Sequence, residues 1–267
     1  MNSLQRALFE MFNWYHDFCE QHGLRYYMQH GTLLGAVRHK GFIPWDDDID
    51  VGMPREDLQK LERLLQENPD KRYLLETPVS SAEDYFYTFA KIYDTRTTVI
   101  ENTRIKSKRG IYLDVFPLDG AGNTQEECRK LEKAIKWKRS LLLARTTGLR
   151  KGRSFWKNAS IIAARTIPNI ILDNKELQRN IDCECSRISF DEAAWVGDIG
   201  DQCMPARCYG TPTLYEFEGS MKYGPQMAEE YLTCRYGDWK KLPVKEKQTP
   251  HHDLLHIDLD KPYQEDE

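Results

Sequence analysis

The stretch Trp45-Asp46-Asp47-Asp48-Ile49-Asp50-Val51 decides the fold and the chemistry that we expect. Asp48–Met53 alternates polar and apolar side chains, which is the pattern of a half-buried strand. Residues two apart in a strand point to the same side, so Asp48 and Asp50 should project together from one edge of a sheet. Adjacent carboxylates repel each other, and a hard divalent cation removes that repulsion. The stretch therefore predicts a metal site for Mg²⁺ or Mn²⁺.

Two other interpretations of this acidic run are a solvated loop and a calcium-binding EF-hand. Four carboxylates within five residues at a strand edge are costly without a counter-ion, which argues against the loop. An EF-hand loop counted from Asp46 needs glycine at its sixth position, where Val51 stands. Gly52 comes one place late, so we reject the EF-hand.

A third carboxylate comes from Asp114, which interrupts the apolar run Ile111–Phe116. Burying an unpaired charge is expensive, so a lone acid in such a strand is usually paired, ligating or catalytic. We expect Asp114 to complete the metal site, with a buried hydrogen bond as the alternative. Asp119 is expected in a turn with Gly120.

Cationic and glycine-containing segments flank the acids. His30-Gly31-Thr32 should join a strand to a helix, where Gly31 lets the backbone approach a ligand and free N–H groups face an anion. Arg38 and Lys40 suit a pyrophosphate beside a metal, or simply the C-terminal end of a helix. Lys91 is either a phosphate ligand or an exposed strand residue.

The remaining patterns predict an α/β (α+β) fold, a mixed sheet formed early in the chain with helices added in the C-terminal half. A first amphipathic helix should end near Gly23, and a second should follow Pro54. The expected strands are Arg25–Gln29, Arg72–Glu76, Phe86–Tyr93, Thr97–Glu101, Ile111–Phe116 and Leu214–Phe217, and the later helices Thr124–Thr146, Ser154–Ile167, Asn174–Ile188 and Ala228–Tyr236.

Composition narrows the class of protein. The chain has 267 residues, enough for one large domain, and seven scattered Cys without a signal-peptide pattern, which favours a reducing, cytoplasmic compartment. Cys183-x-Cys185 and Cys203-x₄-Cys208 fit no common zinc spacing, so we expect free thiols. No run of apolar residues is long enough to span a bilayer.

Charge is unevenly distributed along the chain. Residues 129–165 hold 12 Lys or Arg and one Glu, a local charge of +11, so the rest of the chain carries −15 of the total of −4. With its interleaved Trp and Leu residues, this segment could meet anionic lipid at the inner face of a membrane, or it could be an ordinary basic helical hairpin. The acidic remainder argues against nucleic acid as a partner.

These residues resemble a known family. His30-Gly-Thr-Leu-Leu-Gly-Ala-Val-Arg38, followed by Gly41-Phe-Ile-Pro-Trp-Asp-Asp-Asp-Ile-Asp-Val51, closely resembles the LicD family, which is related distantly to the fukutin-related proteins. Weaker matches follow at Phe217-Glu-Gly219, Tyr231-Leu, Tyr236-Gly-Asp-Trp239, Leu242-Pro243 and His251-His252. The resemblance implies a nucleotidyltransferase-like core across 23–254, an N-terminal helix over 1–22, a basic helical insertion around 129–167 and an acidic tail over 255–267.

The resemblance also implies a reaction, the transfer of phosphocholine from CDP-choline to a hydroxyl of a glycan or lipid-linked glycan. By this resemblance Asp48, Asp50 and Asp114 are the metal-binding and catalytic acids, and Gly31-Thr32 forms the donor-binding turn. The other donor-binding candidates are Arg38, Lys40, Lys91, Trp45 and His252, with Trp45, Tyr85, Tyr87 or Trp239 offering rings to a choline head.

Three alternatives stay open at this point. Ribitol phosphate or another sugar phosphate suits the acids as well as phosphocholine does. A metal-dependent glycosyltransferase would use the same Asp-x-Asp pair for a nucleotide sugar. A non-catalytic glycan-binding module is disfavoured because all three acids are intact.

Overall fold

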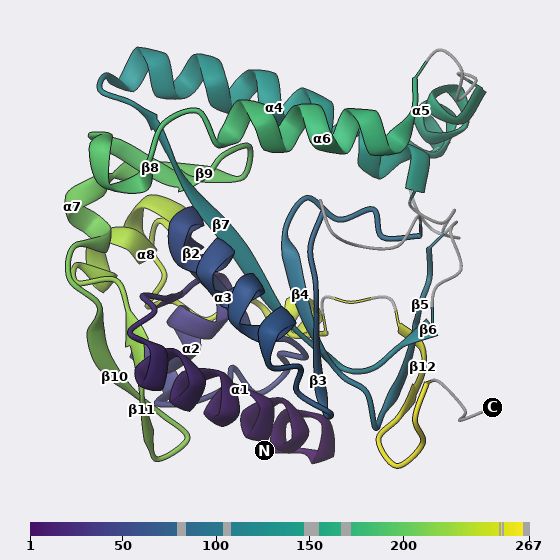
Figure 1. The fold of residues 1–267 in the computed structure, drawn as a ribbon, viewed down its shortest axis with the longest axis vertical. Helices are drawn as coiled ribbons and strands as arrows, with labels where there is room; N and C mark the ends of the chain where they lie inside the picture. Colours follow the sequence, from purple (N-terminus) through teal and green to yellow (C-terminus); the bar gives the residue numbers. More distant parts are fainter. Residues whose placement is uncertain are drawn as a thin grey trace.

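A computed structural model of the chain describes residues 1–78, 84–103, 108–146, 155–166, 172–250, 252 and 254–263. Its main sheet has the strand order β1-β2-β7-β4-β3 (Figure 1). Two further strands extend this sheet, since β8 pairs with β7 and β9 pairs with β8. Only β2 and β7 run parallel, and the other neighbours are antiparallel. The predicted α/β class with a mixed sheet is therefore confirmed. The strands are β1 Tyr27–Met28, β2 Asp50–Pro54, β3 Tyr73–Glu76, β4 Ala90–Asp94, β7 Tyr112–Gly122, β8 Trp195–Asp198 and β9 Gln202–Pro205.

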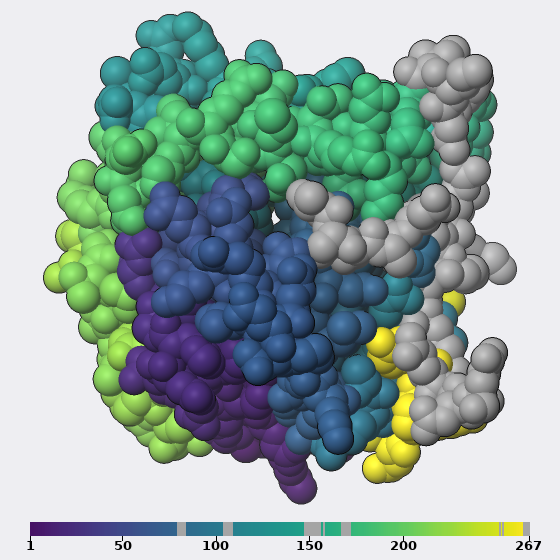
Figure 2. All heavy atoms as spheres, in the orientation of Figure 1, coloured from purple at the N-terminus to yellow at the C-terminus, as the bar shows by residue number. Residues whose placement is uncertain are grey.

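The first helices cover the sheet as their apolar spacing predicts. α1 (Ser3–His22) begins with a capping box at Asn2 and ends at Gly23, whose φ of 61° is the left-handed conformation that glycine adopts readily. α3 (Arg55–Glu67) follows Pro54 and buries three leucines. Both helices lie on the face shown in Figure 2, where α1 is purple and α3 is blue. Between them in sequence lies α2 (His30–His39).

The second half of the chain adds helices and small sheets, as expected. α4 (Gln125–Thr146) and α6 (Asn174–Cys185) lie side by side, with α5 (Phe155–Thr166) packed on α4 near its far end (Figure 1). They enclose a second apolar cluster that includes Ile135, Leu142 and Ile181. The remaining elements are β5 Thr98–Glu101, β6 Lys108–Arg109, η1 Phe190–Glu192, α7 Ala206–Tyr209, β10 Thr213–Phe217, β11 Ser220–Gly224, α8 Ala228–Tyr236, η2 Lys245–Lys247 and β12 Leu254–Asp258.

Several boundaries differ from the sequence prediction because tertiary pairing sets them. β2 begins at Asp50, so Asp48 lies in the segment before the strand rather than within it. β7 continues to Gly122, and the prediction of a turn at Asp119 is wrong because β8 pairs with this part of β7. Residues 255–258, expected within the acidic tail, belong to β12 (Leu254–Asp258) on the edge of β5. Ser154 and Ile167, the predicted ends of one helix, lie outside the described residues.

Helices long and apolar enough to cross a bilayer are absent from the part of the chain that the structure describes.

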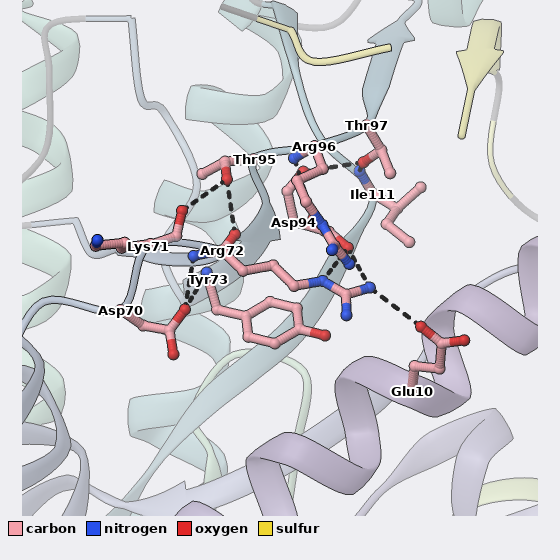
Figure 3. Close-up of polar contacts among 10 residues, drawn as sticks. All are labelled: Glu10, Asp70, Lys71, Arg72, Tyr73, Asp94, Thr95, Arg96, Thr97 and Ile111. Carbon is pink, nitrogen blue, oxygen red and sulfur yellow. Dashed lines mark hydrogen bonds and ion pairs between the residues drawn. The ribbon is translucent and has the colours of Figure 1, made fainter. Parts of the chain in front are cut away.

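A polar network fixes β3 and β4 against α1 (Figure 3). Arg72 donates to Asp94 Oδ2 over 2.8 Å and to Glu10 Oε2 over 3.2 Å. The Asp94 side chain is 1% exposed, whereas that of Glu10 is 58% exposed. The same guanidinium therefore forms one buried and one exposed ion pair.

Replacing these two carboxylates should have very different effects. Asp94→Ala leaves the Arg72 guanidinium without its buried partner and should lower the free energy of unfolding by about 3 kcal/mol. Glu10→Ala removes the exposed pair and should lower it by less than about 1 kcal/mol. Urea denaturation of both variants measures the difference, and equal losses would contradict the assignment of Asp94 as the anchor.

Candidate active site

Three charged residues lie in register across adjacent strands. Asp50 on β2 is paired with Asp114 on the parallel strand β7, and Asp114 is paired with Lys91 on the antiparallel strand β4. Side chains in register on neighbouring strands project to the same side of the sheet. The structure therefore brings the predicted Asp50, Asp114 and Lys91 together, although Asp50 and Asp114 are more than sixty residues apart in the sequence.

Lys91 is buried in this arrangement, contrary to the exposed alternative. Its Nζ lies 3.1 Å from Asp114 Oδ1 and 3.9 Å from Glu101 Oε1. The rings of Tyr87 and Tyr112 face the ammonium at 4.3 and 3.3 Å from their centroids, and both hydroxyls donate to Glu101. Lys91 is thus held by charge and by ring faces, which suits a residue that positions Asp114.

The turn at His30 connects the acids to a second ion pair. His30 has a φ of 47°, an uncommon value for a residue with a side chain. Its Nδ1 lies 3.3 Å from Asp50 Oδ2 and its Nε2 lies 3.2 Å from Asp201 Oδ2, while Arg235 reaches Asp201 over 2.7 Å. Burial opposes the charged imidazole, but the bonds to Asp201 and Asp50 raise the pKa of His30 to about 9.

Gly31 and Thr32 support the acids directly. A Cβ added at Gly31 would lie 2.6 Å from Asp46 Oδ2, so a side chain there would displace that carboxylate. The buried Thr32 Oγ1 accepts a 2.8 Å hydrogen bond from the Asp50 backbone N–H. Thr32 therefore contacts the strand that carries Asp50. The predicted contact of Thr32 with a donor stays a prediction.

The acidic run itself forms a compact group. One carboxylate oxygen from each of Asp46, Asp47 and Asp48 lies within 4.8 Å of the others. His252 closes on this group, with Nδ1 3.2 Å from Asp47 Oδ1 and 3.8 Å from Asp48 Oδ2. His252, a predicted donor-binding residue, thus lies against the acids, and its role in donor binding stays a prediction. Its neighbour His251 lies outside the described residues.

The electrostatics of the group fit a divalent cation. Burial first, and then the neighbouring carboxylates of Asp50, Asp46, Asp114 and Asp47, raise the pKa of Asp48 well above its ordinary value. Burial also raises the pKa of Asp114 to about 6, with Lys91 opposing this and Asp50 adding to it. Oxygen ligands without thiols or neutral imidazoles are the set that Mg²⁺ and Mn²⁺ prefer. The residues present therefore fit the expected metal.

A cavity of about 510 Å³ adjoins these acids. We call it the acidic cavity, because Asp46, Asp48, Asp50 and Asp238 line it. Cations and rings line it too, namely Arg38, Trp45, Tyr236, Trp239, Lys241 and Lys247. A cavity that combines carboxylates with cations and aromatic rings suits a nucleotide-linked phosphate held through a metal.

A second cavity of about 420 Å³ shares His30 and Arg235 with the first. We call it the aromatic cavity, because Phe86, Tyr87, Phe89 and Phe116 line it together with residues of α4. The two cavities therefore adjoin each other at His30 and Arg235.

The predicted donor-binding residues fare differently. Arg38 and Trp45 line the acidic cavity, and Trp239 lies there too. Lys40 is the exposed residue that ends α2 and lines neither cavity, and Tyr85 is a core residue that donates to the Phe89 carbonyl. Asp114 also lines neither cavity, since it is buried beneath them.

Sequence reasoning missed five charged residues that the structure brings to the site, because they are distant in sequence and belong to no local motif. These residues are Glu101, Asp201, Arg235, Lys241 and Lys247.

A further group of metal-binding side chains lies away from the acids. The ligand atoms of Cys128, Glu132 and Cys203 lie within 4.8 Å of one another, and the Cys203 backbone N–H donates to Glu132 over 2.6 Å. This group corresponds to neither of the two spacings, Cys183-x-Cys185 and Cys203-x₄-Cys208, that we considered from the sequence and rejected for zinc. None of the seven cysteines forms a disulfide.

Fold and site define a class of protein, a mixed α/β protein with buried carboxylates collected where two parallel strands begin to pair. Comparison with known proteins then specifies the family. A family model described as the LicD/FKTN/FKRP nucleotidyltransferase domain matches residues 23–148. The chain is also 30% identical, over 93% of its length and 94% of the relative, to the lipopolysaccharide cholinephosphotransferase LicD of Haemophilus influenzae. The chain belongs to the LicD family.

Shorter matches cover other members. The human ribitol 5-phosphate transferase FKRP is 44% identical over 59 residues, which are 22% of this chain and 12% of that protein. An uncharacterized protein of Rickettsia prowazekii is 41% identical over 59 residues, which are 22% of each chain.

Removing the Thr32 hydroxyl should affect stability and the site together. Thr32→Val leaves the buried Asp50 N–H without its acceptor and should lower the free energy of unfolding by about 1–3 kcal/mol. Thr32→Ser keeps the oxygen and should lose less. Denaturant unfolding of the two variants checks this, and equal losses would show that the methyl group matters rather than the hydrogen bond.

Proposed function

We propose that the protein is a metal-dependent transferase that moves phosphocholine, or a related polyol or sugar phosphate, from a CDP-linked donor to a hydroxyl of a glycan. The observation that supports this best is the acidic cavity, which Asp48 and Asp50 line together with Arg38, Trp45 and Trp239. The relative that matches almost the whole chain is named a cholinephosphotransferase, which supports phosphocholine as the transferred group. The ribitol phosphate transferase that matches over 59 residues supports the alternative group.

Asp48 and Asp50 would hold the metal, with Asp46 beside them and Asp114 behind Asp50 in register. When bound, Mg²⁺ or Mn²⁺ neutralises the phosphate oxygens and the charge that develops on the leaving nucleotide. Phosphoryl-type transfer depends on charge neutralisation and alignment more than on a covalent intermediate with the protein. An active site of this kind is therefore expected to hold several fixed carboxylates and to need no nucleophilic side chain.

The chain's own residues would then orient the donor. Arg38 is fixed by a 2.8 Å bond to the Trp239 carbonyl, which aims a permanent cation into the acidic cavity. Lys241 and Lys247 add two positive charges to the lining of the acidic cavity and suit the donor phosphates. Trp45 and Trp239 offer ring faces to a quaternary ammonium or to the cytosine base. Asp114, held by Lys91, would take the proton of the acceptor hydroxyl or share in metal binding.

The assignment of the acids predicts loss of turnover with retention of the fold. Asp48→Asn and Asp50→Asn should each lower the Mg²⁺-dependent release of CMP from CDP-choline by about a thousandfold or more, because the neutral amide cannot replace a metal-binding carboxylate. Glu246→Gln, an exposed acid of η2, serves as the control and should leave CMP release unchanged.

Circular dichroism of each variant shows whether the fold persists. Retained turnover in folded Asp50→Asn protein would refute the metal assignment. Release of a nucleoside diphosphate from a nucleotide sugar, without CMP release from any CDP-linked donor, would support a glycosyltransferase instead.

The lysines that line the acidic cavity predict an effect on the KM for the donor. Lys241→Gln removes one charge from the acidic cavity and should raise the KM for CDP-choline about tenfold with a smaller change in kcat. Lys245→Gln removes the same charge from a nearby exposed residue of η2 that does not line the cavity, so its KM should stay close to that of the wild type. Steady-state kinetics of the pair measures this, and equal KM values would remove Lys241 from donor binding.

A further inference from the structure

The exposed face of α4 and α5 combines large apolar side chains with unpaired cations, and we propose that this face docks the protein on an anionic lipid bilayer. We call it the α4–α5 face and define it by Arg129, Lys133, Trp137 and Leu143 on α4 and by Trp156 and Ile162 on α5. Binding to lipid goes beyond the proposed transfer reaction and does not depend on it.

The apolar part of this face is unusually exposed. Trp156 is 79% exposed, Trp137 66%, Leu143 61% and Ile162 51%. Two tryptophans of the six in the chain are therefore directed to solvent on neighbouring helices. Tryptophan at the headgroup level, with aliphatic side chains below it, is the arrangement typical of interfacial helices.

The cations of α4 divide into two sets, and only the structure shows the division. On the inner side Lys138 pairs with Glu184 and Arg139 pairs with Asp198, each over 2.6 Å, and Arg145 donates to backbone carbonyls. On the outer side Arg129 and Lys133 are exposed and have no ion pair with any residue that the structure describes. The inner charges are thus neutralised within the protein, whereas the outer ones are available to a partner.

The outer residues lie on one stripe of the helix. Lys133, Lys136, Trp137, Ser140 and Leu143 recur at intervals of three and four residues, which places them on a common side of α4. α6 covers the other side, so that in Figure 2 α4 is visible only along the upper edge. The cations and the apolar side chains of α4 can therefore contact one surface at the same time.

Charge and chemistry favour a bilayer over the two other candidate partners. A second copy of this chain docked through the same face would place Arg129 and Lys133 of both copies in one interface, with no acid among the residues that define the face, and this costs free energy. A nucleic acid would use the cations and rings but gains nothing from exposed Leu143 and Ile162, and the rest of the chain carries −15. Anionic headgroups over an acyl region complement both kinds of side chain.

The position of the face relative to the site is consistent with such docking. Leu143 and Lys136 belong to the exposed stripe and also line the aromatic cavity, which shares His30 with the acidic cavity. If the proposed transfer reaction holds, an acceptor attached to lipid would enter the aromatic cavity from the membrane side and reach the acids past His30.

Cosedimentation with vesicles tests the proposal on the full chain. The probes are phosphatidylcholine vesicles with and without phosphatidylglycerol. The wild-type protein should bind the anionic vesicles and release from them at high salt, because headgroup attraction is screened. Arg129→Glu/Lys133→Glu and Trp137→Ser should each weaken this binding on the order of tenfold. The control Arg63→Glu/Lys71→Glu makes the same charge change at exposed residues of α3 and the following loop, and should bind as the wild type does.

Neither Arg129, Lys133 nor Trp137 lines a cavity, so CMP release from CDP-choline in the absence of lipid should be unchanged in these variants. Intact turnover with lost vesicle binding separates lipid docking from the transfer reaction. Equal binding to neutral and anionic vesicles, or wild-type binding by folded Arg129→Glu/Lys133→Glu protein, would overturn the proposal. So would loss of a dimer in Trp137→Ser without any effect on lipid, or tighter binding to an oligonucleotide than to vesicles.

Discussion

The parallel pairing of β2 with β7 is the constraint on which the rest of the site depends. It places Asp50 directly beside Asp114, two carboxylates that repel each other in a buried position. Two ion pairs offset this repulsion, because Lys91 pairs with Asp114 and His30 pairs with Asp50. Each of these cations is itself held by a further carboxylate, Glu101 or Asp201. The free energy of the arrangement therefore depends on a chain of opposite charges rather than on any single pair.

The same chain of charges separates two spaces with different chemistry. The acidic cavity is lined by cations and rings as well as by carboxylates, whereas the aromatic cavity is lined by phenylalanine and tyrosine together with residues of α4. His30 and Arg235 line both cavities. Under the proposed transfer reaction, one cavity would take the donor and the other the acceptor, because a transferase must hold both on either side of the transferred group.

The basic segment illustrates how far composition can be interpreted. A local charge of +11 over residues 129–165 indicates an unusual region, but it does not say which charges face outward. Packing against α6 and β8 neutralises Lys138 and Arg139 and leaves Arg129 and Lys133 exposed. The proposed membrane face is therefore narrower than the segment and is defined by helix orientation.

The sequence by itself determined the acidic run, the third carboxylate on an apolar strand, the main helices and the α/β class, because alternation, helical spacing and capping are local properties. Tertiary structure alone decided that Lys91 is buried against Asp114, that Asp119 lies within β7, and that Thr32 supports Asp50. It also brought Asp201, Arg235 and Lys241 to the site from remote parts of the chain. These features depend on strand register and on which surfaces pack together, and no local pattern of residues encodes either one.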